Sequence, residues 1–314
     1  MRSASGLELP GLAQLYLGTQ VDDQGQGATF RAKRDDLEKL LRFYFEHYGH
    51  YRAAEFYPAT TRRFLRWLAT TKKADGTAYA ETTISRVYST VRHFARWAHR
   101  ERKCFPMGSP VEGVSPPKEP EPPWKGLREK DVDRLITAAH ALRNRPKRSG
   151  ATNQGTRDLA LLHALLGSAL RISELLSLEV SQYDGRRFLG VIVKGGHRRD
   201  RVPVHKKENR EAIASWLSER GDNPGPLFCT RSGKPLLRRQ AYGIIKRIEA
   251  QANAHLPEGE RFTVSPHELR HTLGRELAND RGERFARKQL GHRSGRQLYR
   301  YIQPSDADLE DLFD

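Results

Sequence analysis

The chain has few of the residues that cross-link secreted domains or span membranes. Its 314 residues include two cysteines, Cys104 and Cys229, which lie far apart in the sequence. Two such thiols support neither a disulfide framework nor a cysteine-based zinc site, and they fit a reducing cytosol. The longest apolar stretch, around residues 159–170, contains His163 and is shorter than the roughly 20 residues that cross a bilayer. We therefore expect a soluble cytoplasmic protein that makes no membrane contact.

Acidic residues are outnumbered by basic ones. The chain has 38 Asp plus Glu against 55 Lys plus Arg, which gives a formal net charge of +17. A positive field of this size attracts polyanions, and nucleic acid is the commonest such partner. The sequence contains no cluster of carboxylates spaced to bind Mg²⁺ and no Gly-x-x-x-x-Gly-Lys loop for nucleotide phosphates. We therefore expect chemistry on nucleic acid that uses no metal and no cofactor.

Hydrophobic periodicity predicts a first half built of helices. Apolar residues recur every three or four positions from Asp35, from Thr60 and, most clearly, over Thr82–Arg100. Seven of the 18 residues from Pro106 to Pro123 are prolines. Proline fixes φ and removes a backbone donor, so this stretch predicts an extended linker. Residues 1–30 show no clear period and predict a flexible segment.

The second half combines helical patterns with one β-hairpin. Two runs with strand character, Phe188–Val193 and Arg201–Val204, flank Gly195 and Gly196, which supply the turn. Helical patterns stand before and after this hairpin, over residues 129–142, 157–169, 237–253 and 266–279. We therefore expect a mainly α protein with a small antiparallel β-sheet, an α+β architecture.

Polar residues of the second half offer the parts needed to break a nucleic-acid backbone. Arg171 and Arg270 carry planar, permanently charged groups that suit the non-bridging phosphate oxygens. Lys194, at the tip of the hairpin, can protonate a leaving oxygen, His267 can exchange a proton near neutral pH, and His292 can donate to a phosphoryl oxygen. A tyrosine late in the chain can attack phosphorus and form a covalent intermediate.

Four short motifs carry these residues in order, namely Leu170-Arg171-Ile172-Ser173-Glu174-Leu175, Val193-Lys194-Gly195-Gly196, Pro266-His267-Glu268-Leu269-Arg270-His271-Thr272 and Leu290-Gly291-His292. In this order they resemble the tyrosine recombinase (phage integrase) family, in its Xer-like and Cre-like form, and the resemblance runs from about residue 35 to the end. It implies catalytic roles for Arg171, Lys194, His267, Arg270 and His292. Glu174 and His271 fall on supporting positions. The lysine loop is one residue longer than is usual in the family.

The resemblance offers two candidates for the attacking tyrosine. The family places its nucleophile nine residues after the final histidine, which here is Tyr301, and Arg300-Tyr301-Ile302-Gln303-Pro304-Ser305 is similar to a common family ending. Tyr299 is the alternative nucleophile, because Gln297-Leu298-Tyr299 is similar to another ending if two residues are deleted. We favour Tyr301.

The resemblance also implies a plan of domains. A flexible segment would occupy residues 1–30, and a helical core-binding domain, a SAM-like DNA-binding unit, would occupy 31–117. A Pro-rich linker at 118–127 would lead to the catalytic domain at 128–314, which would have the DNA breaking-rejoining fold and end in a C-terminal tail. In the family, such a tail docks on a neighbouring protomer.

The family's reaction would make this chain a site-specific DNA recombinase that acts through a 3′-phosphotyrosine, without cofactor or metal. The partners implied are double-stranded DNA recombination sites and further copies of the chain, assembled as a tetramer on two paired sites in the cytoplasm, at the nucleoid. The task would be integration, excision, resolution or transposition of a mobile element. A type IB topoisomerase, which shares this active-site logic and relaxes DNA, is an alternative.

One motif also spells a different chemistry. His267-Glu268-x-x-His271 is the two-histidine zinc motif of metallopeptidases, with Glu268 as the base. The longer form of that motif would place a third ligand at position 277, which is Leu277, and Glu283 is the acidic residue that could replace it. A zinc metallopeptidase is therefore the weaker alternative.

Overall fold

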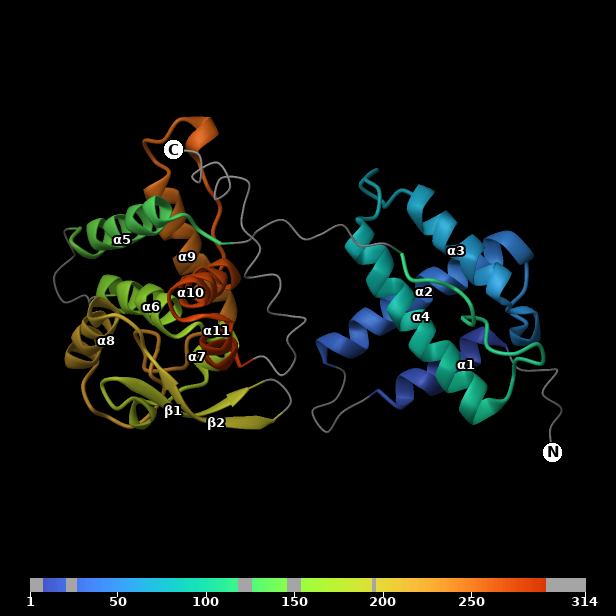
Figure 1. Cartoon of the computed structure of the whole chain (residues 1–314), viewed down its shortest axis with the longest axis horizontal. Coiled ribbons are helices and arrows are strands. Elements are labelled where there is room, and N and C mark those ends of the chain that lie inside the picture. Colours follow the sequence, from blue (N-terminus) through green and yellow to red (C-terminus); the bar gives the residue numbers. More distant parts are fainter. Residues whose placement is uncertain (1–7, 21–26, 118–125, 146–153, 194–195, 292–314) are drawn as a thin grey trace. The chain divides into compact units, whose positions relative to one another are not determined.

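A computed structural model of the chain (Figure 1) describes residues 8–20, 27–117, 126–145, 154–193 and 196–291. The chain divides into two compact units, Met1–Pro122 and Pro123–Asp314. Each unit encloses its own large cluster of buried apolar side chains. Among the helices of these described ranges, none is both long enough and apolar enough to cross a membrane.

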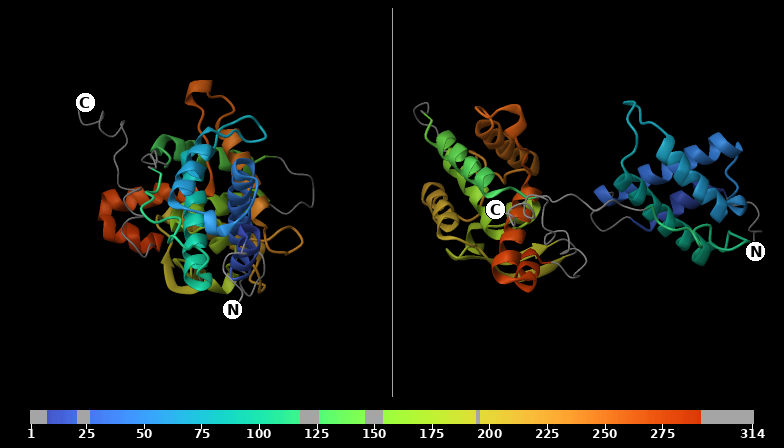
Figure 2. Two further views of the ribbon diagram at one scale, coloured as in Figure 1. Left: turned by 90° about the vertical axis from the view of Figure 1, so that its right-hand side faces the viewer. Right: turned by 45° about the horizontal axis from the view of Figure 1, so that its top comes forward.

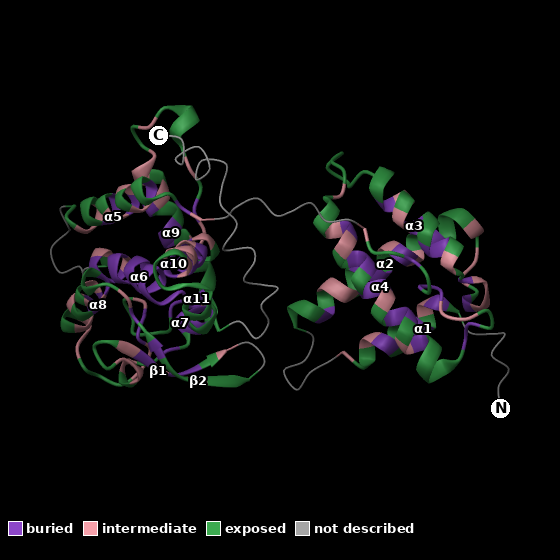
Figure 3. Cartoon of the chain, in the orientation of Figure 1, coloured by how far each residue is buried: buried purple, intermediate pink, exposed green. Residues whose placement is uncertain are grey.

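The described part of the first unit is a helical bundle. Its helices are α1 (Leu9–Gly18), α2 (Ala28–Tyr48), α3 (Pro58–Thr70) and α4 (Glu81–Arg102), with a 3-10 turn, η2 (Ala53–Glu55). The buried faces of α2 and α4 meet inside the bundle (Figure 3). The apolar stripe expected in α4 lies inward, since its buried residues include Ile84, Val87, Tyr88, Val91, Phe94, Ala95 and Ala98.

Helix α1 corrects the expectation that residues 1–30 are flexible. Pro10 lies in its first turn, where proline is favoured. Leu9, Leu12 and Tyr16 are buried, and the Tyr16 ring packs against Phe94 at 5.6 Å between ring centroids. A helix of ten residues carries too little periodicity to stand out, and its partners lie on α2 and on α4, the latter far along the chain.

A buried carboxylate joins α2 to α4. Asp36 is fully buried, and its Oδ2 accepts hydrogen bonds from Arg86 Nη1 at 2.6 Å and from Thr90 Oγ1 at 2.9 Å. The ion pair and the hydroxyl compensate the charge inside the apolar core, where a lone carboxylate would be strongly destabilising.

Part of the Pro-rich stretch packs on this unit. Thr61 Oγ1 of α3 donates to Pro110 O at 2.6 Å, and Tyr88 Oη of α4 donates to Val114 O at 2.5 Å. Val111 and Val114 are buried at the same place. Residues 110–114 are therefore fixed against the bundle rather than leading away from it.

The second unit is built around a helix that is apolar on every side. It contains α5 (Glu129–Arg143), α6 (Gln154–Ser168), α7 (Ile172–Leu176), η3 (Val180–Gln182), β1 (Arg187–Val193), β2 (His197–Pro203), α8 (Lys207–Arg220), α9 (Arg238–Ala252), η4 (Glu258–Glu260), α10 (Pro266–Arg281) and α11 (Glu283–Leu290). Eight successive residues of α6, from Leu159 to Leu166, are buried. Such a helix belongs in a core, and α6 contacts α5, α8 and α10 (Figures 1 and 3).

The strands β1 and β2 form an antiparallel hairpin in which Phe188 pairs with Val202 and Val193 pairs with His197. The hairpin lies beside the end of α11 (Figure 2), and Arg199 of β2 bonds with Lys288 of α11. A mainly helical chain with one small antiparallel sheet is the fold class that the sequence predicted, and it is confirmed.

Candidate active site

Arg171 directly precedes α7, as its N-cap, and is oriented by Glu174. The backbone N–H of Arg171 donates to Glu174 Oε2 at 3.0 Å, and Arg171 Nη1 donates to Glu174 Oε1 at 2.8 Å. The first of these bonds is one half of a capping box, in which the third helical residue accepts from the backbone N–H of the residue before the helix. The Glu174 side chain is 4% exposed and the Arg171 side chain 38%. The buried carboxylate therefore aims a guanidinium that remains open to a ligand.

A left-handed residue makes the turn into that helix. Ala169 follows the end of α6 with φ of +52°, a conformation that L residues other than glycine seldom adopt. Its carbonyl accepts a hydrogen bond from Arg270 Nη1. The strained turn therefore connects the first arginine motif to the second.

Helix α10 presents His267 at its start. The Ser265 N–H donates to Glu268 Oε2 at 2.6 Å, the Glu268 N–H donates to Ser265 Oγ at 3.4 Å, and Pro266 occupies the first turn. These features fix where the helix begins. His267 is exposed, and its ring meets that of His271 edge to face with 4.4 Å between centroids.

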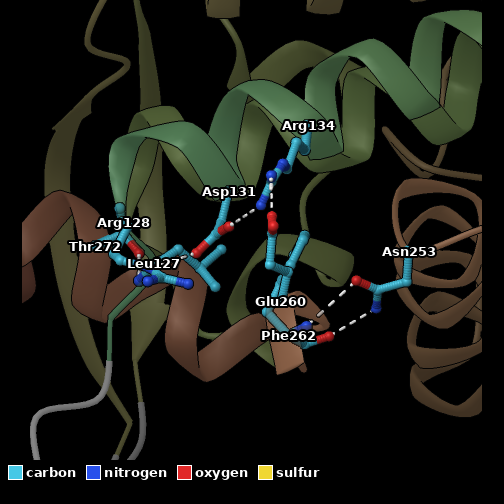
Figure 4. A network of polar contacts seen from close by, with 8 residues as sticks. All are labelled: Leu127, Arg128, Asp131, Arg134, Asn253, Glu260, Phe262 and Thr272. Atoms are coloured by element: carbon cyan, nitrogen blue, oxygen red, sulfur yellow. Dashed lines mark hydrogen bonds and ion pairs between the residues drawn. The ribbon is translucent and has the colours of Figure 1, made fainter. Parts of the chain in front are cut away.

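A polar network anchors this end of α10 to the rest of the unit (Figure 4). The Leu127 N–H donates to Thr272 Oγ1 at 2.9 Å, which ties the start of the unit to the second turn of α10. Arg134 of α5 bonds to Asp131 at 3.2 Å and to Glu260 at 2.8 Å. The segment that leads into α10 is therefore bound to α5 through Glu260.

Arg270 joins three of the four motif segments. It is 1% exposed, and its two terminal nitrogens donate to Ala169 O and to Leu290 O, the latter at 2.5 Å. Both carbonyls lie at helix ends, where the macrodipole is negative and a cation is stabilised. The guanidinium therefore fixes the segments that precede Arg171 and His292.

Two residues that the sequence motifs did not single out also hold this region. Gln289 Nε2 donates to Ser168 O at 2.8 Å and to Pro203 O at 3.0 Å. Arg199 Nη2 donates to Lys288 O at 3.0 Å. Gln289 directly precedes Leu290-Gly291-His292, and this adjacency to the motif was its only signal in the sequence.

The remaining candidates, Lys194, His292, Tyr299 and Tyr301, lie outside the described residues. Among the described candidates, the structure pairs Arg171 with Glu174 and His267 with His271. Arg270 bonds to the segments that precede Arg171 and His292.

The arrangement of α10 does not favour the zinc motif. The Glu268 carboxylate caps the helix through Ser265, and Leu277 is buried in a small apolar cluster. Over the described ranges, His, Cys, Asp and Glu side chains form no group of three that could hold a metal ion. His267 and His271 thus lack a third ligand from this part of the chain.

Comparison with known proteins defines the class. The model of the phage integrase family matches residues 125–308, more than half of the chain. The chain is 33% identical over 290 residues to the tyrosine recombinase XerC of Rhodospirillum centenum, covering 90% of this chain and 79% of that protein. It is 29% identical over 294 residues to the tyrosine recombinase XerD of Xanthomonas campestris pv. campestris, covering 90% and 84%. The chain therefore belongs to the phage integrase family of tyrosine recombinases.

Solved structures share the fold. A λ integrase dimer bound to a COC′ core site matches with a TM-score of 0.68 and 15% identity, over 96% of this chain and 78% of that one. The Tn1549 transposon integrase in complex with circular intermediate DNA matches with a TM-score of 0.67 and 17% identity, over 98% and 100%. The family that the motifs indicated is thus confirmed, and its fold is the one observed.

Proposed function

We propose that the chain is a site-specific DNA recombinase that cuts and rejoins double-stranded DNA through a covalent 3′-phosphotyrosine. Its relatives are tyrosine recombinases, and the solved neighbours include a λ integrase bound to a core site. The observation that supports the site best is the junction at Arg270, which joins the segment before Arg171 to the segment before His292. Residues more than a hundred positions apart are thereby brought to one place.

In the proposed first step, the phenolic oxygen of Tyr301 bonds to the scissile phosphorus as the bond from phosphorus to the 5′ oxygen breaks. His267 takes the phenolic proton, and Lys194 gives a proton to the leaving oxygen. Arg171 and Arg270 stabilise the negative charge that develops on the non-bridging oxygens, and His292 donates to one of them. Tyr299 is the alternative attacking residue.

In the second step, the 5′-hydroxyl of the partner strand attacks the phosphotyrosine. A phosphodiester forms, and the tyrosine is released with a proton. Because each step exchanges one phosphate ester for another, the reaction consumes no nucleotide. The supporting roles fall to Glu174, which orients Arg171, and to His271, whose ring contacts His267.

The domain plan belongs to the same proposal. Residues 31–117 would form the core-binding domain and 128–314 the catalytic domain, joined by a linker at 118–127. The boundary between the compact units, after Pro122, lies inside that linker. Four protomers on two paired sites would exchange strands in the cytoplasm, at the nucleoid, for integration, excision, resolution or transposition of a mobile element.

The test is a covalent adduct. The full chain is incubated with a random-sequence pool of nicked duplexes in excess EDTA, denatured in detergent, and assayed for DNA that stays attached to protein. We expect an adduct from the wild type and from Tyr299→Phe, and none from Tyr301→Phe. Loss in Tyr299→Phe alone would move the nucleophile to Tyr299, and a wild type that attaches to no DNA would refute the proposed function.

A further inference from the structure

A third arginine reaches the helix end that Arg270 holds. Arg199 Nη2 donates to Lys288 O at 3.0 Å, and Arg270 Nη2 donates to Leu290 O at 2.5 Å. These carbonyls belong to the last turn of α11, where the helix offers too few N–H donors for its carbonyls. Two guanidinium groups from distant elements therefore share one helix terminus, next to the segment that leads into His292.

The Arg199 guanidinium lies close against Gly291. This glycine has φ of +66° and ends α11, with its N–H donating to Arg287 O and Lys288 O. A Cβ at this position would lie 3.3 Å from Arg199 Nη1 and 3.5 Å from its Cζ, so a larger residue would require the guanidinium to shift by a few tenths of an ångström. Glycine at the residue that precedes His292 therefore lets Arg199 approach this closely.

Arg199 also lies within the electrostatic reach of the motif residues. Burial lowers its pKa, the positive charges of Arg270 and Arg171 lower it further, and the negative charge of Glu174 opposes them. Arginine keeps its proton under all ordinary conditions, so three cations and one carboxylate are held together here. Such crowding of like charge is unfavourable without a ligand and is relieved when an anion binds.

The charge balance matches a phosphodiester under attack. Three guanidinium charges less the Glu174 carboxylate leave two positive charges in this group of side chains. A phosphodiester carries one negative charge, and attack by a phenolate adds a second. Preorganised cations aimed at charge that develops in the transition state are usually the largest single contribution to catalysis.

We propose that Arg199 is a positioning residue of the strand-cleavage site, which holds the Lys288–Gly291 turn against β2 and adds positive charge beside Arg171 and Arg270. This inference rests on the proposed function, because the anion is the scissile phosphate. Through Arg199, β2 would connect two parts of the site, because this strand follows Lys194 and bonds to the segment that precedes His292.

The chain contains a matched control. Arg198 is the neighbour of Arg199 on β2, its side chain is 70% exposed, and its ion pair with Asp200 is long, at 3.8 Å. Arg198→Gln and Arg199→Gln each remove one positive charge from the same strand. Any effect of net charge on DNA binding is therefore shared, and an effect specific to the site belongs to Arg199 alone.

The experiment measures the rate of adduct formation on a nicked duplex recovered from the wild-type adduct. We expect Arg199→Gln to be about 100-fold slower than Arg198→Gln, the scale on which loss of one transition-state donor acts, with similar DNA affinity in a mobility-shift assay. Arg199→Lys keeps the charge and should recover part of the rate. Thermal unfolding of each variant shows whether it is folded.

A second substrate separates charge stabilisation from a purely structural role. Replacing one non-bridging oxygen of the scissile phosphate by a methyl group makes that phosphate neutral. The ratio of wild-type to Arg199→Gln rates should then fall toward one, whereas a structural defect would leave it unchanged. Equal rates for Arg198→Gln and Arg199→Gln, or an undiminished ratio on the neutral substrate, would overturn the proposal while the wild-type adduct keeps the proposed function intact. If Arg199→Gln does not fold, Arg199→Met, which also removes the charge, takes its place with Arg198→Met as its control, and the same outcomes apply.

Discussion

At the scale of one residue, Ala169 adopts an unfavourable backbone conformation that the site requires. It is buried, it has a positive φ, and its carbonyl accepts from Arg270. The turn places Arg171 at the N-cap of α7, with only two residues between it and the end of α6. A strained residue is tolerated here because the packing around it fixes the conformation.

We predict that glycine at position 169 leaves the stability of the protein nearly unchanged and that valine lowers it. Ala169→Gly relieves about 1–2 kcal/mol of left-handed strain but removes a buried methyl worth about 0.8 kcal/mol. The free energy of unfolding should therefore change by less than about 1 kcal/mol, since these two terms oppose each other. Ala169→Val adds a β-branched side chain to a left-handed, close-packed site. This change should lower the free energy of unfolding by at least about 2 kcal/mol.

Urea unfolding of both variants provides the measurement. The glycine variant serves as the control for any change of side chain at the turn. A valine variant as stable as the wild type would show that residue 169 does not hold a positive φ in solution.

At the scale of elements, α11 is held by a small apolar cluster shared with α10 and by side-chain hydrogen bonds. Its buried residues are Ala286, Gln289 and Leu290. Gln289 bonds to the end of α6 and to the end of β2, and Arg199 and Arg270 bond to its carbonyls. The position of α11, and with it the segment leading to His292, therefore depends on polar contacts as well as on its packing against α10.

We predict that Gln289→Ala loosens this helix. The change leaves the carbonyls of Ser168 and Pro203 without this donor, and an unsatisfied buried group is unfavourable by about 1–3 kcal/mol. Stability should fall by about 2 kcal/mol, the middle of that range, and amide hydrogens of α11 should exchange faster. Adduct formation should slow while DNA affinity is kept.

Lys288→Ala is the matched control, because the Lys288 side chain is exposed and its carbonyl, which Arg199 uses, remains. Its effect on stability should stay within about 0.5 kcal/mol, as is usual for surface substitutions. Equal exchange rates in both variants would show that Gln289 does not hold α11.

The bounds of the helices and strands show where sequence patterns predict secondary structure correctly. The expected helix over residues 82–100 is observed as Glu81–Arg102, and the one over 266–279 as Pro266–Arg281. The second strand was expected from Arg201 but begins at His197. Its first residues are polar on both faces, so they lack the alternation that reveals a strand.

At the scale of the whole molecule, the net charge of +17 should make the affinity for DNA depend strongly on salt concentration. Binding to duplex DNA releases counterions, and a protein that contacts six to ten phosphates loses about 10³–10⁵ in affinity between 50 and 200 mM salt. We predict a loss of this size for a labelled duplex, measured by fluorescence anisotropy. An affinity that does not change with salt would contradict a DNA-binding role for this charge.

The amino-acid sequence alone determined the chemistry and most of the secondary structure. Helical stripes, the Gly-Gly turn and the order of the motifs are local features, because period and spacing depend on neighbouring residues. They predicted the fold class and the family before any contact was known.

Only the tertiary structure decided how the motifs are joined. Arg270 bonds to a carbonyl 101 positions away, Arg199 to one 89 positions away, and Gln289 to one 121 positions away. Such bonds leave no periodic trace in the sequence, since any arginine or glutamine can donate to any backbone carbonyl that folding brings near. For the same reason Arg199 and Gln289 could not be recognised until β2, α6 and α11 were in place.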